Sequence, residues 1–197
     1  MHTAKLFLVR HAEALPSPDQ PEADWPLSAQ GNAQAHQLID LLSKIGAEKI
    51  VSSPYLRARE TVRPFAESNQ IKIEIDPDLR ERLIATSWIE DFSTAINIVH
   101  GDTSLSLPGG ESARAALVRF QGALERIVTN SPGGRIIVAT HGAVIAHLMR
   151  SHIATLPADY HVRIERPHVF ELEWSSPPRW VGEVRLSGSP SGLFGAK

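Results

Sequence analysis

The chain has 197 residues, of which 42% are hydrophobic and 21% charged, a composition typical of a folded globular protein rather than a disordered or fibrous one. Its 20 basic and 22 acidic residues nearly cancel, so composition gives no support to general binding of nucleic acid or membrane. The sequence has no cysteine, which excludes disulfides, thiolate nucleophiles and cysteine-ligated metals. It shows neither an export signal nor an apolar run long enough to span a bilayer, so we expect a cytoplasmic protein.

The first part of the chain alternates apolar runs with helical patterns. An unbroken apolar run predicts a strand over 5–9 that is buried on both faces. Ser28 is a suitable N-cap, and apolar residues recur at helical spacing until Gly46, which predicts a helix between them. The next predicted elements are a strand at 49–52, a helix at about 56–68 weakened by Pro64, and a strand at 71–75 nearer a sheet edge.

The second part begins with a loose pattern that extends to a glycine-rich turn. Ser112 can then cap a long helix, because one apolar stripe continues from there to Val128. The predicted elements are an amphipathic segment around 88–99, a turn at 108–110, a helix at 113–128, a strand at 135–140, a helix at about 143–150, and strands at 168–174 and 180–186. The tail at 187–197 is expected to be mobile.

Strands that alternate with helices predict a single-domain, three-layer α/β/α fold over 1–186 with a mostly parallel central sheet. Such sheets bind ligands beyond the C-terminal ends of their strands. His11 follows the first predicted strand, and His141 follows the strand at 135–140. We therefore expect these two histidines to share one crevice.

Six short motifs occur in order along the chain. They are Leu8-Val9-Arg10-His11-Ala12-Glu13, Asp24-Trp25-Pro26-Leu27-Ser28-Ala29-Gln30-Gly31, Ser52-Ser53-Pro54-Tyr55-Leu56-Arg57-Ala58-Arg59-Glu60-Thr61, Leu79-Arg80-Glu81, Pro108-Gly109-Gly110-Glu111-Ser112 and Ala139-Thr140-His141-Gly142. Together they resemble the histidine phosphatase superfamily, also called the phosphoglycerate mutase-like family. An isolated Arg-His pair would mean little, whereas the ordered set is specific.

The resemblance implies a phosphoglycerate mutase-like fold and a phosphatase that acts through a phosphohistidine at His11. A neutral imidazole suits attack on a phosphate dianion, because a carboxylate would be repelled. Arg10 and Arg57 would hold the phosphate oxygens, and His141, if protonated, would add a third positive group. Glu81 would protonate the leaving oxygen and then activate water, although an ion pair with its arginine neighbours is an alternative.

The resemblance also bears on substrate and cofactor. It assigns substrate contacts to Ser17, Glu111 and Ser112, the last of which can also cap a helix. No metal or cofactor is expected, because arginine and histidine supply the positive charge that magnesium supplies at other phosphoryl-transfer sites. The expected partner is a small phosphorylated metabolite or a phosphoprotein.

Several departures from the family's pattern affect the choice of reaction. Ala12 replaces a usual glycine, and Ser17 stands where mutases and many phosphatases of the family carry asparagine. The stretch between Glu81 and His141 is also shorter than in the mutases. These features favour a phosphatase over a phosphoglycerate mutase, and they leave the substrate open. A protein phosphohistidine phosphatase and a non-catalytic module that binds phosphorylated ligands are the further alternatives.

Overall fold

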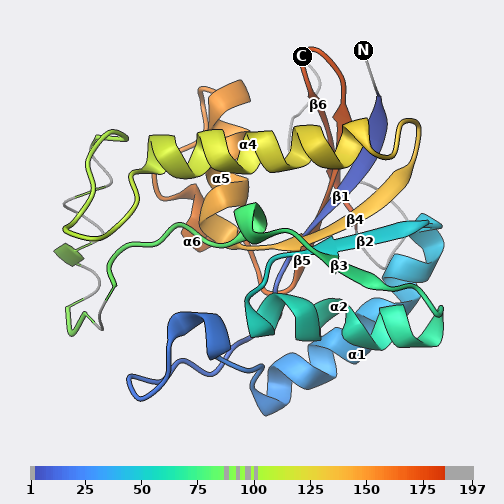
Figure 1. Ribbon diagram of the computed structural model, residues 1–197, viewed down its shortest axis with the longest axis horizontal. Helices are drawn as coiled ribbons and strands as arrows, with labels where there is room; N and C mark the ends of the chain where they lie inside the picture. The colour runs from blue at the N-terminus through green and yellow to red at the C-terminus, as the bar shows by residue number, and fades with distance from the viewer. Residues whose placement is uncertain (1–2, 87–88, 92–93, 96–98, 100–101, 185–197) are drawn as a thin grey trace.

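The structure is a computed structural model that describes residues 3–86, 89–91, 94–95, 99 and 102–184. Its centre is a six-stranded sheet of order β3-β2-β4-β1-β5-β6 (Figure 1). The strands are β1 (Ala4–Arg10), β2 (Lys49–Ser52), β3 (Ile73–Ile75), β4 (Arg135–Thr140), β5 (His168–Trp174) and β6 (Arg179–Glu183). Strands β1 to β4 pair with one another in parallel. At one edge of the sheet, β5 pairs antiparallel with β1, and β6 pairs antiparallel with β5. The prediction of a mostly parallel α/β sheet is confirmed.

Helices cover both faces of this sheet, so the described chain forms three layers (Figure 1). The helices are α1 (Ala29–Ile45) and α2 (Leu56–Ser68) on one face, and α4 (Ala113–Thr129), α5 (Gly142–His152) and α6 (Tyr160–Arg163) on the other. Successive residues of β1 serve the two cores in turn: Leu6 and Leu8 pack toward α4 and α5, whereas Phe7 and Val9 pack toward α1 and α2. Burial on both faces explains why the sequence of β1 lacks polar alternation.

Local capping chemistry sets the helix boundaries as predicted. The Ser28 hydroxyl accepts a hydrogen bond from the Gly31 amide at the start of α1, and Gly46 ends that helix with a φ of 63°. Ser112 caps α4 in the same way. Pro64 lies inside α2, which nevertheless continues to Ser68.

Gly31 also joins α1 to the loop that follows His11. A Cβ atom at Gly31 would lie 2.0 Å from the Glu13 carbonyl oxygen, so only glycine allows this approach. The Ser28 amide donates to the same carbonyl at 3.0 Å, and the Ser28 hydroxyl donates to the Glu13 carboxylate at 2.7 Å. This segment of the second motif therefore fixes the chain just beyond His11.

The later elements differ from prediction in their details. β6 begins at Arg179 and ends at Glu183, while 185–186 of the predicted strand lie outside the described residues. Helix α6 was not predicted, because a single turn has no periodicity to detect. Much of the amphipathic segment expected at 88–99 and the tail at 187–197 also lie outside the described residues. In the part of the chain that is described, no helix has the length and apolar character needed to cross a membrane.

Candidate active site

Two histidines meet at the C-terminal edge of the sheet. Arg10 and Thr140 are paired at the ends of the adjacent parallel strands β1 and β4, and the His11 amide donates to the Thr140 carbonyl at 3.1 Å. The ring centroids of His11 and His141 are 5.2 Å apart, with the ring planes at 60°. The expected convergence of these residues is therefore observed, because neighbouring parallel strands end at the same edge.

The hydrogen bonds of His11 define its tautomer. Its Nδ1 atom lies 2.7 Å from the Ala12 carbonyl oxygen, which can only accept, so Nδ1 carries the ring hydrogen. Its Nε2 atom accepts from Arg57 Nε at 3.2 Å and therefore bears a lone pair. Burial, reinforced by the charge of Arg57, lowers the pKa of His11 well below the usual histidine value. His11 is thus a neutral imidazole with a nucleophilic nitrogen.

His141 is completely buried beside it. Its Nε2 atom lies 2.8 Å from the Ser53 hydroxyl oxygen, which already accepts from the Tyr55 amide at 3.2 Å. In the described chain the Ser53 hydroxyl hydrogen has no acceptor other than Nε2, so the hydroxyl donates to Nε2 and the His141 ring hydrogen lies on Nδ1. That Nδ1 atom is buried and has no hydrogen-bond partner in the described chain. Burial, together with nearby Arg57, lowers the pKa of His141 well below the usual histidine value, so the ring is neutral in this structure.

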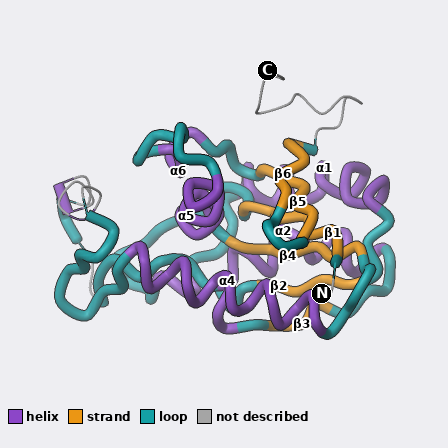
Figure 2. The backbone as a smooth tube through the Cα atoms, turned by 90° about the horizontal axis from the view of Figure 1, so that it is seen from above, coloured by secondary structure: helices purple, strands orange, loops and turns teal. Residues whose placement is uncertain are grey.

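Arg10 is held against the same corner by backbone carbonyls. Its Nη1 atom donates to His161 at 3.0 Å and also to Ile164, both at the end of α6, which packs beside α5 (Figure 2). A Cβ atom at Gly142 would lie 2.7 Å from Arg10 Cζ, so any larger residue after His141 would displace the Arg10 guanidinium from its present position. Burial and the charge of Arg166 lower the pKa of Arg10 to about 10, which leaves it cationic near neutrality. Its buried Nε has no partner among the described residues.

Arg57 lies in the first turn of α2, with a side chain only 4% exposed. Its Nη1 atom donates to the Glu22 carbonyl at 2.7 Å, and its Nη2 atom donates to the Glu22 carboxylate at 2.7 Å. Its guanidinium also lies over the Tyr55 ring at 4.8 Å and the Trp25 ring at 5.6 Å. Sequence reasoning missed Glu22, because the 3-10 helix η1 (Glu22–Asp24) sits in a proline-rich loop that shows no periodicity.

The carboxylate of Glu81 contacts the first turn of α5, the helix that begins directly after His141. Its Oε2 atom accepts from the Ala143 amide at 3.0 Å, and its Oε1 atom accepts from the Val144 amide at 3.2 Å. The positive end of α5 thus holds the carboxylate. The alternative of a surface ion pair is not observed: in the described chain Glu81 forms no ion pair with Arg80 or Arg82.

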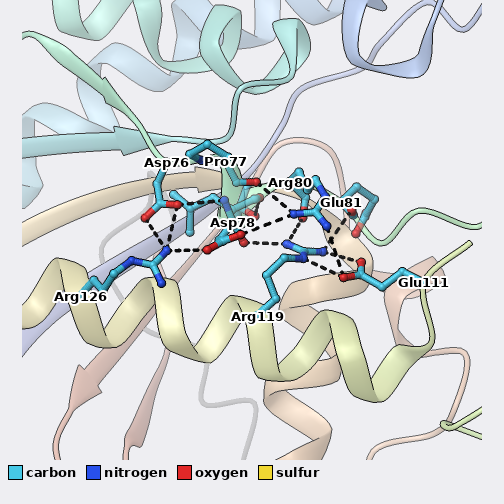
Figure 3. Close-up of polar contacts among 10 residues, drawn as sticks. Asp76, Pro77, Asp78, Arg80, Glu81, Glu111, Arg119 and Arg126 are labelled. Carbon is cyan, nitrogen blue, oxygen red and sulfur yellow. Dashed lines mark hydrogen bonds and ion pairs between the residues drawn. The ribbon is translucent and has the colours of Figure 1, made fainter.

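A buried arginine on α4 holds the backbone that carries Glu81 (Figure 3). Arg119 donates to the carbonyls of Asp78 at 2.7 Å, Arg80 at 3.1 Å and Glu81 at 3.4 Å. Its other hydrogen bonds, of 2.8 and 2.6 Å, go to both carboxylate oxygens of Glu111. The five hydrogen bonds of one planar guanidinium therefore fix the segment from η2 (Pro77–Leu79) to Glu81.

The three residues expected to contact substrate have local partners instead. The Ser17 hydroxyl accepts from the Asp19 amide at 3.2 Å, and Ser112 caps α4. Burial raises the pKa of Glu111, but its hydrogen bonds to Arg119 outweigh this effect and leave the pKa below the usual value. In the described chain none of these three side chains hydrogen-bonds to either active-site histidine.

Ala12, which replaces a usual glycine of the family, causes no backbone strain. Gln70 is the one non-glycine residue with a positive φ among those described, so Ala12 does not need glycine's conformational freedom. The Ala12 amide donates to the Thr61 hydroxyl at 2.9 Å, and its methyl group is buried. Alanine is therefore accommodated directly beside His11.

The assembled site combines two guanidinium groups with two neutral imidazoles and one carboxylate. Arg10 Nε and His141 Nδ1 are buried nitrogens that lack partners in the described chain, as an oxyanion-binding site requires. No group of three or more histidine, aspartate or glutamate side chains among the described residues is arranged to hold a metal ion. The arrangement can bind a phosphoryl group and present a nitrogen nucleophile to it.

The buried histidines predict how stability depends on pH. We expect the free energy of unfolding to fall as the pH drops below about 6.5, because the unfolded chain then binds protons that folded His11 and His141 resist. Above that pH their contribution is fully present. Chemical denaturation across this range measures the slope, and the double variant His11→Gln with His141→Gln should show a shallower one. An unchanged slope in the double variant would contradict the lowered pKa values.

Comparison with known proteins places this chain in a family. The sequence matches the histidine phosphatase superfamily (branch 1) over residues 6–176. A protein named probable phosphoglycerate mutase GpmB, from Enterobacter sp. (strain 638), is 28% identical over 205 residues, which cover 96% of this chain and 94% of the relative.

Solved structures show the same fold. The phosphate complex of a mycobacterial glucosyl-3-phosphoglycerate phosphatase has a TM-score of 0.72 and 24% identity, with coverage of 95% of this chain and 97% of that one. YhfR of Bacillus stearothermophilus has a TM-score of 0.75 and 23% identity, with coverage of 90% and 95% respectively. From the sequence match over residues 6–176, the chain belongs to the histidine phosphatase superfamily, branch 1.

Proposed function

We propose that this protein is a phosphatase that hydrolyses a phosphomonoester, or another phosphorylated group, through a phosphohistidine at Nε2 of His11. The observation that carries the proposal is the protonation pattern of His11: the Ala12 carbonyl fixes the hydrogen on Nδ1, so Nε2 has the lone pair. A nucleophile in this state is ready to attack near neutral pH without first losing a proton. The flanking Arg10 and Arg57 supply the charge that a phosphate dianion requires.

In the first step the Nε2 lone pair of His11 forms a bond to phosphorus. The cycle begins with Glu81 in its carboxylic acid form, which carries the proton on Oε2. The ester P–O bond breaks, its electron pair passes to the leaving oxygen, and that oxygen takes the proton from Glu81, which becomes a carboxylate. The imidazole becomes positively charged, and its Nδ1–H remains bonded to the Ala12 carbonyl. Arg10 Nε and His141 Nδ1 are two buried donors without partners in the described chain, and they can hold phosphoryl oxygens as charge develops on them.

In the second step water attacks phosphorus while the Glu81 carboxylate takes its proton. The N–P bond breaks, its electron pair returns to Nε2, and the products are inorganic phosphate and neutral His11. Glu81 Oε1 accepts two backbone hydrogen bonds and Oε2 accepts one, so Oε2 keeps a lone pair for the transferred proton. The cycle is hydrolysis and restores the starting state.

Phosphoryl transfer of the mutase type is the second candidate, favoured by the name of the Enterobacter relative. The two reactions share the first step and differ in whether water or a second metabolite receives the phosphoryl group. The Ser17 hydroxyl accepts a hydrogen bond within a local turn, where the resemblance implies an asparagine that contacts the transferred phosphate in the mutases. This departure weakens the mutase candidate, although many phosphatases of the family carry the same asparagine.

Turnover of a substrate panel tests the proposal. Purified protein is incubated with p-nitrophenyl phosphate, with sugar, nucleotide and glycerate phosphates, and with a phosphohistidine-bearing protein. Release of inorganic phosphate supports the phosphatase, and the preferred compound identifies its class. Transfer to a second metabolite without phosphate release would support the mutase, while binding without turnover of any compound would support a non-catalytic module.

The hydrogen bonds from Arg119 to the backbone that carries Glu81 give a prediction about protonation of the leaving group. Arg119→Lys loses the planar array of donors, so we expect kcat/KM for alkyl phosphates, which have poor leaving groups, to fall by about 10- to 100-fold. The value for p-nitrophenyl phosphate should fall much less, because its leaving group needs little protonation.

Arg126→Gln is the matched control for this experiment. Arg126 is also on α4 and bonds to Asp76 and Asp78 of the neighbouring turn, but it is 52% exposed and does not contact Glu81 (Figure 3). We expect both substrates to change by less than about twofold in this variant. Equal losses on both substrates in Arg119→Lys would show that Arg119 acts on stability alone.

A further inference from the structure

Each of the three nitrogens of Arg57 makes one hydrogen bond within the protein, which uses three of its five N–H groups. Its Nε donates to His11 Nε2 at 3.2 Å, its Nη1 to the Glu22 carbonyl at 2.7 Å, and its Nη2 to the Glu22 carboxylate at 2.7 Å. The nucleophilic lone pair of His11 and the Nη2 position of Arg57 are therefore both occupied. A phosphoryl oxygen that bonds to Arg57 Nη2 where Glu22 Oε1 now lies has to displace the Glu22 carboxylate, because both anions use the same donor.

The burial of Arg57 and of Glu22 determines which side chain can leave the ion pair between them. Arg57 is 4% exposed, so its charge needs an anion beside it whatever the state of the site. The Glu22 side chain is 31% exposed, so its carboxylate can turn toward water. The bond from Arg57 Nη1 to the Glu22 carbonyl needs no change, so the exchange involves a side-chain rotation while the backbone of η1 stays in place.

We propose that Glu22 is a specificity-determining residue whose carboxylate holds Arg57 until a phosphoryl dianion replaces it. The proposal rests on the proposed function, since it assigns Arg57 to the phosphoryl group. The single negative charge of the Glu22 carboxylate sets the charge that a ligand needs in order to displace it from Arg57. A phosphomonoester dianion brings two negative charges and displaces the carboxylate. Carboxylates and phosphodiesters bring one negative charge and compete poorly. The site is thereby selective for phosphomonoesters over the more abundant monoanions.

Equilibrium binding of inorganic phosphate to Glu22→Gln is the direct test. The measurement is titration calorimetry at about pH 8, where phosphate is mainly the dianion. Because the glutamine is neutral and competes weakly for Arg57, we expect the dissociation constant of phosphate to fall by roughly fivefold relative to the unchanged protein. A larger dissociation constant in Glu22→Gln would overturn the proposal, since weaker phosphate binding would mean that Glu22 orients Arg57 for phosphate.

Asp24→Asn is the matched control. Asp24 lies in the same 3-10 helix, is exposed, and has no ion pair or side-chain hydrogen bond in the described chain. Its replacement removes the same charge two residues away, so we expect the phosphate dissociation constant to change by less than about twofold. An equal gain in both variants would overturn the proposal in favour of a general electrostatic effect.

A second measurement tests the charge threshold itself. In Glu22→Ala the fork of Arg57 is open to added acetate, so acetate should weaken phosphate binding to this variant and leave the unchanged protein almost unaffected. If acetate weakened phosphate binding equally in both proteins, the claim that the Glu22 charge excludes monoanions from Arg57 would be overturned.

These results can be separated from a failure of the proposed function. Binding is measured without turnover, and hydrolysis of p-nitrophenyl phosphate is measured independently on the same samples. Hydrolysis with no gain in phosphate affinity in Glu22→Gln would reject the role of Glu22 and keep the phosphatase. A gain in affinity without hydrolysis would reject the phosphatase and keep Glu22 as the residue that excludes monoanions. Failure of phosphate to bind to any of these proteins would overturn both.

Discussion

His11→Ala is expected to lower kcat/KM for every substrate of this protein by at least about 10⁴-fold. The variant lacks His11 Nε2, the nitrogen that forms the bond to phosphorus in the proposed mechanism, whereas His141 Nε2 faces the buried hydroxyl of Ser53. Direct attack by water on a phosphate held by Arg10 and Arg57 accounts for the activity that remains. Steady-state assays with p-nitrophenyl phosphate measure the loss.

His36→Ala serves as the control for this variant, since His36 is an exposed histidine on α1. Its activity should be unchanged. Circular dichroism and thermal unfolding then establish that His11→Ala is folded, which is expected because His11 lies at a strand end and contributes no side chain to the two large apolar cores. A folded His11→Ala variant with near-normal turnover would exclude His11 as the nucleophile.

Glu81→Gln is expected to show the second largest effect, and the size depends on the leaving group. For alkyl phosphates kcat/KM should fall by about 10²–10⁴-fold, because glutamine cannot supply the proton that the departing oxygen needs. For p-nitrophenyl phosphate kcat/KM should fall far less. The comparison uses kcat/KM because this quantity reports the steps through formation of the phosphoenzyme, whereas kcat also contains its hydrolysis.

Glutamine has nearly the same shape as glutamate and keeps part of the contact with α5. Its carbonyl oxygen can accept from the α5 amides that Glu81 contacts, so the loop after η2 keeps one of its two bonds to that helix. The slow second step should also appear as an initial burst of p-nitrophenol followed by slower release. Equal losses for good and poor leaving groups would reject Glu81 as the general acid.

Much of the fold follows from the local pattern of the sequence. The bounds of β2, α2 and β4 are those predicted, because each element has a clear apolar pattern. The meeting of His11 and His141 could also be predicted, since it depends only on two parallel strands that end at the same edge. These features are encoded within single elements or within one rule of sheet topology.

The rest of the site depends on contacts between elements that have no local signature. Glu22 approaches Arg57 from a one-turn helix in a loop, and Arg119 belongs to an ordinary amphipathic helix in which nothing marks it out. Glu81 could be named from its motif, but its bonds to the first turn of α5 cannot be read from the sequence. The substrate contacts inferred for Ser17 and Glu111 remain predictions, since both side chains have local partners here.

Capture of the covalent intermediate tests the central claim most directly. Glu81→Gln and the unchanged protein are mixed with p-nitrophenyl phosphate, quenched with alkali within the first turnover, and digested for mass spectrometry that preserves the N–P bond. We predict an acid-labile phosphoryl group on the peptide that contains His11, in larger amount in Glu81→Gln because its hydrolysis is slowed. Turnover that proceeds with no phosphoryl group on His11, or with one on another residue, would contradict the account.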